Sequence, residues 1–242
     1  MHLPSIRAAA AVAALALAPC AQAALQVITN PNQLDFSGNF VYAASFGGGG
    51  GAQVGNAVFT SVASNGSGAP AGLTVSGFNV DTPWGGASNL GATADANGLE
   101  AVMSTIIWSS GLNPGNIDLA VTTGTTYRLQ LLFSEGCCNN RHFDVNVESG
   151  LLTQEIVGTA FNANNTWTAS ATQGYALTLD FTAADASLNI NFLRHAPGDT
   201  NYHISGLTLE RLATVPEPTG LALAAAALLG AGVARRRRAV RG

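Results

Sequence analysis

Three features of residues 24–214 predict an all-β fold built as an antiparallel β-sandwich. Runs rich in Val, Ile, Leu, Thr and aromatic residues recur along the segment, and Gly, Asn, Asp and Pro separate them. Within several runs apolar and polar residues alternate, as at Tyr127, Leu129, Leu131 and Phe133. The alternation gives each strand one apolar and one polar face, which is the pattern that two sheets packed face to face require.

The expected strands follow one another along this segment. They are 25–29, 40–46, 57–62, 73–80, 116–121, 126–134, 142–148, 151–157, 175–181, 187–193 and 204–212. The glycine run 47–51 and the segment 64–72 are expected to be loops, because their residues favour turns. Segment 81–98 is expected to be a long loop that carries Trp84, and binding usually resides on long loops of a rigid sandwich.

One segment departs from the strand pattern. In residues 97–108 the apolar side chains of Leu99, Val102, Met103 and Ile106 are spaced i, i+3, i+4 and i+7. This spacing is typical of a short amphipathic helix. We expect the helix to cap one end of the sandwich, and we expect Trp108, at its end, to be a core residue.

The N-terminal residues predict export. Residues 1–23 combine an early Arg7, an apolar Ala/Leu-rich middle and the triplet Ala21-Gln22-Ala23, which is the order of a secretory signal peptide cut after Ala23. The alternative is lipoprotein processing at Cys20, which Pro19 disfavours because a small residue is required there. Either interpretation places the mature chain outside the cytoplasm after passage through the Sec export machinery.

The charge of the mature segment excludes one class of partner. Residues 24–214 contain four arginines, no lysine and thirteen acidic residues, which gives a formal charge of −9 with histidine neutral. A domain this acidic repels phosphate backbones, so nucleic acid is not an expected partner. Sparse charge combined with many Ser, Thr, Asn and Gly residues suits a neutral polar partner.

Cys137 and Cys138 are the two cysteines of the mature segment, and they are adjacent. Neighbouring Cα atoms lie about 3.8 Å apart, whereas ordinary disulfides join Cα atoms roughly 4.4–6.8 Å apart. An oxidised pair would form a vicinal ring in a loop; an intermolecular bridge and two free thiols are the alternatives. Export favours oxidation. A stiffened loop is favoured over a catalytic thiol, because no His and Asn partner pattern accompanies the pair.

The C-terminal residues 215–242 combine three parts in order. They are the motif Val215, Pro216, Glu217 and Pro218, sixteen uncharged residues at 219–234, and a basic end at 235–242 that includes Arg235, Arg236, Arg237 and Arg238. A helix over 219–234 would be about 24 Å long, short of the ~30 Å hydrocarbon core. We therefore expect a transmembrane helix with a modest hold on the bilayer and its arginines on the cytoplasmic side.

This tail resembles the PEP-CTERM sorting signal in the order and spacing of its three parts. The resemblance implies a Gram-negative bacterium and an exosortase, a membrane protease that recognises the tail and acts near the Pro-Glu-Pro triplet. It also implies transient insertion in the inner membrane, followed by release or re-anchoring at the cell surface. Proteins with this signal tend to accompany exopolysaccharide production.

A second resemblance concerns the domain itself. The pattern Tyr-x-Leu-x-Leu-x-Phe-x-Glu from Tyr127 to Glu135, a short loop, Arg141 and Phe143-Asp144-Val145 resemble the malectin-type module of the galactose-binding-like sandwiches. Residues 40–49 resemble the start of that module, and 204–212 resemble its last strand. The resemblance implies a jelly-roll-like sandwich and, in some members, sugar binding without catalysis. The adjacent cysteines are not part of the family pattern.

Candidate ligand contacts come from the chemistry of sugars, whose apolar C–H faces stack on aromatic rings while their hydroxyls pair with polar side chains. Aromatic residues in polar loops are therefore the first candidates, with acidic and arginine side chains near them. The candidates are Trp84, Trp167, Tyr202, Asp199, Glu135 and Arg141. Packing is the alternative role for each aromatic ring. A rim ion pair of little energetic value is the favoured alternative for Arg141.

A catalytic role and a bound metal ion are the alternatives to sugar binding. Glu135 and Asp144 offer the two carboxylates that a glycosidase needs, but no spacing in the sequence is diagnostic. No Gly-x-Ser-x-Gly elbow or His-Glu-x-x-His motif is present. No cofactor or metal is predicted, because the histidines lack metal-ligand spacing with the cysteines. A structural calcium ion is compatible with such sandwiches, but no acidic loop has a calcium spacing.

Together these observations predict an exported, exosortase-sorted protein that binds carbohydrate without catalysis at the cell surface or in the exopolysaccharide matrix. A structural or adhesive matrix protein with no defined ligand is the first alternative. A glycan-active enzyme is the second.

Overall fold

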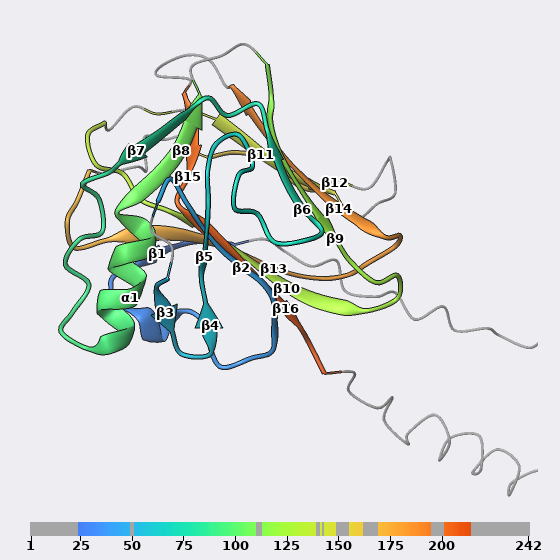
Figure 1. The fold of residues 1–242 in the computed structure, drawn as a ribbon, viewed down its shortest axis with the longest axis horizontal. Coiled ribbons are helices and arrows are strands. Elements are labelled where there is room, and N and C mark those ends of the chain that lie inside the picture. The colour runs from blue at the N-terminus through green and yellow to red at the C-terminus, as the bar shows by residue number, and fades with distance from the viewer. Residues whose placement is uncertain are drawn as a thin grey trace, which may run out of the picture.

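The chain folds into two large β-sheets that face each other (Figure 1). The computed structural model describes residues 24–48, 51–109, 113–138, 141, 143–148, 155–161, 169–194 and 201–213. The first sheet has six strands in the order β1-β13-β10-β16-β2-β5, and the second has five in the order β12-β11-β14-β9-β6. The predicted all-β sandwich is confirmed.

The strands of the first sheet are β1 (Ala24–Ile28), β2 (Phe40–Phe46), β5 (Thr60–Val62), β10 (Thr126–Phe133), β13 (Gly174–Thr182) and β16 (Gly206–Arg211). Those of the second are β6 (Leu73–Ser76), β9 (Gly115–Ala120), β11 (Phe143–Glu148), β12 (Glu155–Phe161) and β14 (Ser187–Arg194). Neighbouring strands in both sheets run antiparallel, except that β2 and β5 are parallel.

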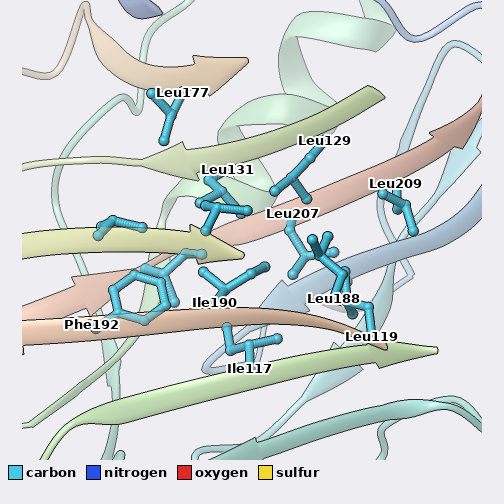
Figure 2. Close-up of a cluster of buried hydrophobic side chains, with 14 of the residues drawn as sticks. Ile117, Leu119, Leu129, Leu131, Leu177, Leu188, Ile190, Phe192, Leu207 and Leu209 are labelled. Carbon is cyan, nitrogen blue, oxygen red and sulfur yellow. The ribbon is translucent and has the colours of Figure 1, made fainter. Parts of the chain in front are cut away.

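The main core lies between the two sheets and follows from the alternating pattern. On β10, Leu129 and Leu131 are buried and stand level with leucines of both neighbouring strands, β13 and β16. The facing sheet contributes matching pairs across β9 and β14, such as Ile117 with Ile190. Figure 2 shows these side chains meeting between the sheets. Burial of this continuous apolar layer holds the two sheets together.

The predicted helix over 97–108 is only partly correct. The helix α1 runs from Ala94 to Met103, and Thr105–Ser109 forms strand β8 instead. The residues Thr-Ile-Ile-Trp include three that favour strands because of β-branching, and they pair on both sides with other strands. The helix also does not cap an end of the sandwich. Its apolar face, with Leu99 and Met103, packs with Ala43 and Leu132 on the outer face of the first sheet.

A small third sheet lies beside the sandwich. It has the order β15-β8-β7, where β15 is Tyr202–Ile204 and β7 is Val80–Pro83. The predicted strand 73–80 divides into β6 and β7 at Gly77, whose φ of 79° suits glycine. A Cβ at Gly77 would lie 2.0 Å from the Pro114 carbonyl oxygen, so the backbones meet there. The predicted strand 204–212 likewise divides between β15 and β16.

Two short elements complete the description. The predicted strand 57–62 divides into β4 (Ala57–Val58), which pairs with β3 (Gln53–Val54), and β5. A short 3-10 helix, η1 (Pro31–Gln33), is capped by Asn30, whose side chain accepts a hydrogen bond from the backbone N–H of Asn32. Residues 64–72 form turns and irregular loop, as predicted, whereas the predicted loop 81–98 includes the end of β7 up to Pro83 and the start of α1 at Ala94.

Both predicted export signals lie outside the described residues. These are the signal peptide at 1–23 and the tail at 215–242, with its motif, its transmembrane helix at 219–234 and its basic end. Within the described part of the chain, no helix has the length and apolarity needed to cross a bilayer.

Candidate functional site

The outer face of the small sheet forms a groove lined by two tryptophans. Ile107, Tyr202 and Ile204 point from this sheet into the main core, so the alternate residues face outward. The groove has a volume of about 240 Å³. It is lined by Thr82, Trp84, Ile106, Trp108, Cys137, Cys138, Arg141 and Asn201, and we call it the indole groove.

A buried ion pair forms the base of the groove. Glu135, just after β10, is fully buried, and Arg141, just before β11, is 4% exposed. The Arg141 Nε donates to Glu135 Oε2 at 2.9 Å, and Arg141 Nη1 donates to the Asn201 carbonyl oxygen at 3.1 Å. Because both charges are withdrawn from water, removal of either one would leave the other uncompensated in the interior.

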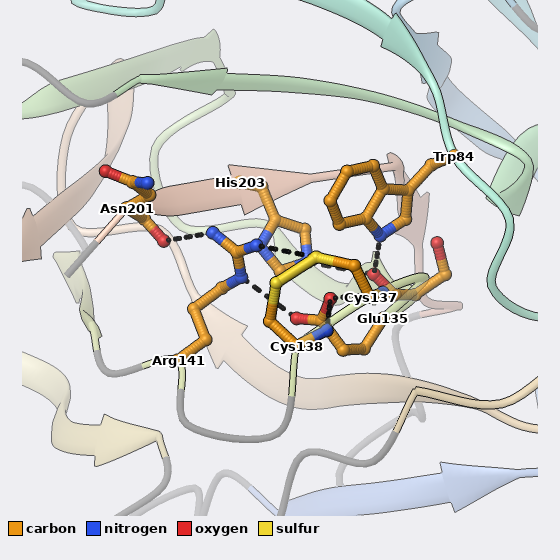
Figure 3. Close-up of a disulfide and its surroundings, with 8 residues drawn as sticks. Trp84, Glu135, Cys137, Cys138, Arg141, Asn201 and His203 are labelled. Carbon is orange, nitrogen blue, oxygen red and sulfur yellow. Dashed lines mark hydrogen bonds and ion pairs between the residues drawn. A yellow bond between two sulfur atoms is a disulfide. The ribbon is translucent and has the colours of Figure 1, made fainter. Parts of the chain in front are cut away.

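The second carboxylate oxygen of Glu135 holds the cysteine loop. Glu135 Oε1 accepts hydrogen bonds from the backbone N–H groups of Cys137 and Cys138, each at 3.1 Å. A disulfide joins the two adjacent cysteines, whose Cα atoms are 3.7 Å apart. Figure 3 shows the disulfide beside Arg141 and Glu135. The carboxylate therefore fixes the arginine and the disulfide in one arrangement.

Trp84 is anchored at both its edge and its face. Its Nε1 donates to the Ser134 carbonyl oxygen at 3.0 Å, and the Arg141 guanidinium carbon lies 5.6 Å from the centre of its ring (Figure 3). A cation over an indole face is an attractive arrangement. Trp84 remains half-buried, so part of its ring is left for the groove.

The same Ser134 carbonyl contacts His203, which is fully buried beneath the groove. His203 Nε2 lies 3.0 Å from that oxygen, and because a carbonyl only accepts hydrogen bonds, Nε2 carries the proton. Burial, together with the positive charge of Arg141, lowers the pKa of His203 well below its ordinary value. His203 is therefore neutral at physiological pH.

Two glycines allow the Trp84 loop to reach the Glu135 loop. A Cβ at Gly86 would lie 2.7 Å from the Glu135 carbonyl oxygen, and one at Gly136 would lie 2.8 Å from the Gly85 nitrogen. Contacts that short are not tolerated, so both positions require glycine for this close backbone approach. The sequences Trp84-Gly85-Gly86 and Glu135-Gly136 are thus packed together as one unit.

The structure brings together part of the predicted site. Trp84, Arg141 and the cysteine pair line one groove, and Glu135 lies directly beneath it. Glu135 is corrected from ligand contact to support, because both its oxygens already accept protein hydrogen bonds. Arg141 is paired with an acid as the alternative interpretation proposed, but the pair is buried rather than at a rim.

Tyr202 is corrected from an exposed contact to a core residue. It is fully buried, and its hydroxyl oxygen lies 2.8 and 2.7 Å from the carbonyl oxygens of Gly77 and Asn113, which share its single proton. Its ring packs edge-on against Phe78. No face of the ring is left for a sugar. Trp167 and Asp199, the remaining candidates, lie outside the described residues.

Sequence reasoning missed four groove residues, which are Thr82, Ile106, Trp108 and Asn201. Trp108 was expected in the core, yet it is half-buried, lines the groove, and donates from Nε1 to Thr82 Oγ1 at 3.2 Å. Asn201 also lines the groove. The available signal was the β-branched run before Trp108, which favours a strand over a helix. Successive residues of a strand point to opposite faces, so Trp108 can face outward on a strand where the helical pattern would bury it.

A second hollow of about 420 Å³ lies along β2 and is lined by Asn39, Phe40, Val41, Asn56 and Val58, among others. It is larger than the indole groove, but its half-buried aromatic residue, Phe40, packs against the core beneath it, and its exposed apolar side chains are valines. Valine offers no flat ring face, so we regard the indole groove as the better candidate for sugar binding.

Glu135, Cys137 and Cys138 place potential ligand atoms within 4.8 Å of one another, the spacing of a metal cluster. Cysteine binds metals as a thiolate, and both sulfurs are in the disulfide. The carboxylate is occupied by Arg141. The oxidised cluster therefore does not fit a metal ion.

Comparisons with known proteins show a likeness of fold. No protein-family model and no curated protein sequence matches the chain. A structure of the plant receptor-like kinase ANX2 superposes with a TM-score of 0.51 at 12% identity, covering 74% of this chain and 51% of that one. The ANXUR2 extracellular domain from Arabidopsis thaliana gives 0.48 at 13% identity, with the same coverage. The chain spans about half the length of these structures. The superposition on ANX2 shows a likeness of the β-sandwich fold alone.

Proposed function

We propose that the domain is an exported carbohydrate-binding module that holds a neutral sugar in the indole groove without catalysis. The observation that carries the proposal is the pairing of Trp84 and Trp108 in one groove of about 240 Å³. Ligand sites are typically concave and lined by aromatic side chains with a few placed polar groups. Thr82 and Asn201 supply uncharged polar groups at this groove.

The electrostatics of the groove favour a neutral sugar over an anionic one. Arg141 is the cation in the groove lining, and its charge is balanced by Glu135 at 2.9 Å. The mature segment also carries a formal charge of −9, which repels uronic acids and sulfated sugars. A hexose with an apolar ring face therefore suits the groove best.

A glycan array probed with the full chain tests this function. We expect binding to neutral glycans and little binding to uronic acid or sulfated glycans. Absence of binding to every glycan, including polysaccharide from the producing cell, would favour the structural or adhesive matrix protein instead. Trp167, which lies outside the described residues, stays a predicted contact, and Trp167→Ala belongs in the same experiment.

The absence of catalysis is part of the proposal. Glu135 is one of the two carboxylates that a glycosidase would need, and it is fully buried with both oxygens engaged by Arg141 and the cysteine loop. A carboxylate so occupied is poorly placed to transfer a proton to a sugar. Release of reducing ends from any glycan that the array identifies would contradict this.

We also propose that an exosortase sorts the protein to the cell surface through residues 215–242. The support is the three-part order of Pro216-Glu217-Pro218, the apolar run and the arginines. Mass spectrometry of the surface material tests it. The expected mature protein begins after Ala23 and lacks Arg235–Arg241. An intact arginine segment in that material would rule out sorting by cleavage.

A further inference from the structure

The disulfide between Cys137 and Cys138 belongs to a groove wall rather than to the frame of the fold. A cross-link stabilises a protein mainly by closing a loop in the unfolded chain, and the effect grows with loop length. Adjacent cysteines close the shortest loop available, so their bridge contributes little to global stability. Both cysteines do, however, line the indole groove.

Both cysteines are accessible, and their sulfur atoms lie beside the Arg141–Glu135 ion pair, with the guanidinium nearest to Cys137. Cys137 is exposed and Cys138 is partly exposed. Arg141 Nη2 is 3.9 Å from Cys137 Sγ. A nearby guanidinium stabilises a thiolate, and a stabilised thiolate is a better leaving group in thiol–disulfide exchange.

We propose that the Cys137–Cys138 disulfide is a thiol–disulfide exchange site, and that its reduction by a dithiol opens the indole groove. A thiolate of the dithiol attacks Cys138 Sγ and forms a mixed disulfide. The original S–S bond breaks, and its electron pair leaves on Cys137 Sγ beside Arg141. The second thiolate of the dithiol then displaces Cys138 and closes the dithiol's own disulfide. Two electrons pass to the cysteines, which take up two protons.

The oxidised ring keeps the two cysteine side chains together on one wall of the groove. Their backbone N–H groups are held by Glu135 Oε1, and Oε2 of the same carboxylate accepts from Arg141, whose guanidinium lies over the Trp84 ring. After reduction both side chains rotate independently, so a ligand must order them when it binds. Ordering two side chains and their loop weakens binding by about tenfold. This consequence for the ligand rests on the proposed carbohydrate function, whereas the exchange reaction does not.

Alkylation tests the exchange reaction without any glycan. The full chain is treated with dithiothreitol, alkylated with iodoacetamide and analysed by peptide mass spectrometry. We expect two alkyl groups on the Cys137–Cys138 peptide and a Tm that changes by less than about 3 °C. With excess glutathione followed by an acid quench, we expect the mixed disulfide on Cys138. A pair that resists reduction until the protein unfolds, or an adduct confined to Cys137, would overturn the proposal.

Two further measurements test the opening of the groove. The first is hydrogen exchange at the Cys137 and Cys138 amides, which should become faster on reduction. The second is the binding of methyl α-glucoside, α-galactoside and α-mannoside to reduced and to oxidised protein. None should bind better to the reduced protein, and the preferred glycoside should bind about tenfold more weakly. The control is the Cys137→Ala/Cys138→Ala double variant, which should behave as reduced protein and ignore dithiothreitol. Unchanged exchange rates and affinity after reduction would refute the opening. If no glycoside binds the oxidised protein, the carbohydrate function fails, while alkylation and hydrogen exchange still decide the redox proposal.

Discussion

At the scale of single residues, Glu135 organises the site because its carboxylate accepts hydrogen bonds from several neighbouring groups at once. One oxygen accepts two backbone N–H groups of the cysteine loop and the other accepts the Arg141 guanidinium. A buried charge is costly unless it is paired and hydrogen-bonded. The carboxylate and the guanidinium therefore depend on each other, and losing one leaves the other uncompensated.

We expect Glu135→Gln to lower the free energy of unfolding by about 3–5 kcal/mol, because it leaves the Arg141 charge buried without a counter-ion. The matched control is Asp180→Asn, which removes a carboxylate from Arg128 in a pair whose side chains are 28% and 45% exposed. That change should cost no more than about 1 kcal/mol. Urea denaturation measures both, and equal losses would contradict the structural role assigned to the buried pair.

His203 predicts a pH dependence of stability. Its pKa is lowered in the folded state, so on acidification the unfolded chain binds a proton before the folded chain does. The contribution of neutral, buried His203 to the free energy of unfolding is thus present at pH values above the ordinary histidine pKa. It is lost as the pH falls below that pKa. The difference in unfolding free energy between the protein and His203→Gln should fall by up to about 1.4 kcal/mol per pH unit from pH 6.5 downward. A difference that stays constant between pH 7 and 5 would argue against this.

The residue types within short stretches of the sequence predicted some members of the site correctly and misplaced others. Trp84 and Arg141 were identified because loop aromatics and rare charges are informative, whereas the adjacent cysteines were expected only to stiffen a loop. Tyr202 was misplaced because its sequence neighbours are polar, whereas its side chain points into the core from β15. The face on which a strand residue points depends on which strands pair with it, and local composition does not contain that information.

At the scale of elements, the segment around α1 shows how two patterns compete. Leu99, Val102 and Met103 have helical spacing and are buried on one face of α1. Ile106 fits the same spacing, yet it lies on β8 and is also buried. Either element would bury these four residues, so burial alone does not separate helix from strand. The β-branched residues after Met103 decide in favour of the strand.

Gly98 provides a test of how α1 packs. Replacing glycine by alanine in a helix normally stabilises it by up to about 1 kcal/mol. Here a Cβ would lie 2.0 Å from the Gln53 carbonyl oxygen on β3. Gly98→Ala should therefore destabilise the protein by about 1–3 kcal/mol, whereas Asn97→Ala on the exposed side of the same helix should be neutral or slightly stabilising. Thermal unfolding of both variants checks the prediction, and a more stable Gly98→Ala protein would place α1 away from β3.

At the scale of the whole molecule, the sandwich was predictable because its signal is repeated. Strands such as β9 and β14 alternate cleanly between buried and partly exposed residues, so each of them independently indicates an inner and an outer face. The indole groove was not predictable in full, because β7, β8 and β15 come from three distant segments. Trp108 and Asn201 meet Trp84 only through that tertiary pairing, which no single window of sequence reveals.

The domain thus consists of a β-sandwich and an indole groove on the small sheet beside it. Burial between two sheets supplies stability, while Glu135, Arg141 and the disulfide set the shape of the groove. Substitutions in the groove wall should therefore alter binding without unfolding the chain, with the buried ion pair as the exception.

The central claim is that Trp84 and Trp108 hold the ligand, and calorimetric titration tests it most directly. The full chain is titrated with the glycan that binds best on the array, alongside Trp84→Ala, Trp108→Ala and Val58→Ala, the last of which alters the second hollow. We predict that each tryptophan variant binds at least about tenfold more weakly while remaining folded, and that Val58→Ala binds normally. Full binding by both tryptophan variants, with loss in Val58→Ala, would contradict the account.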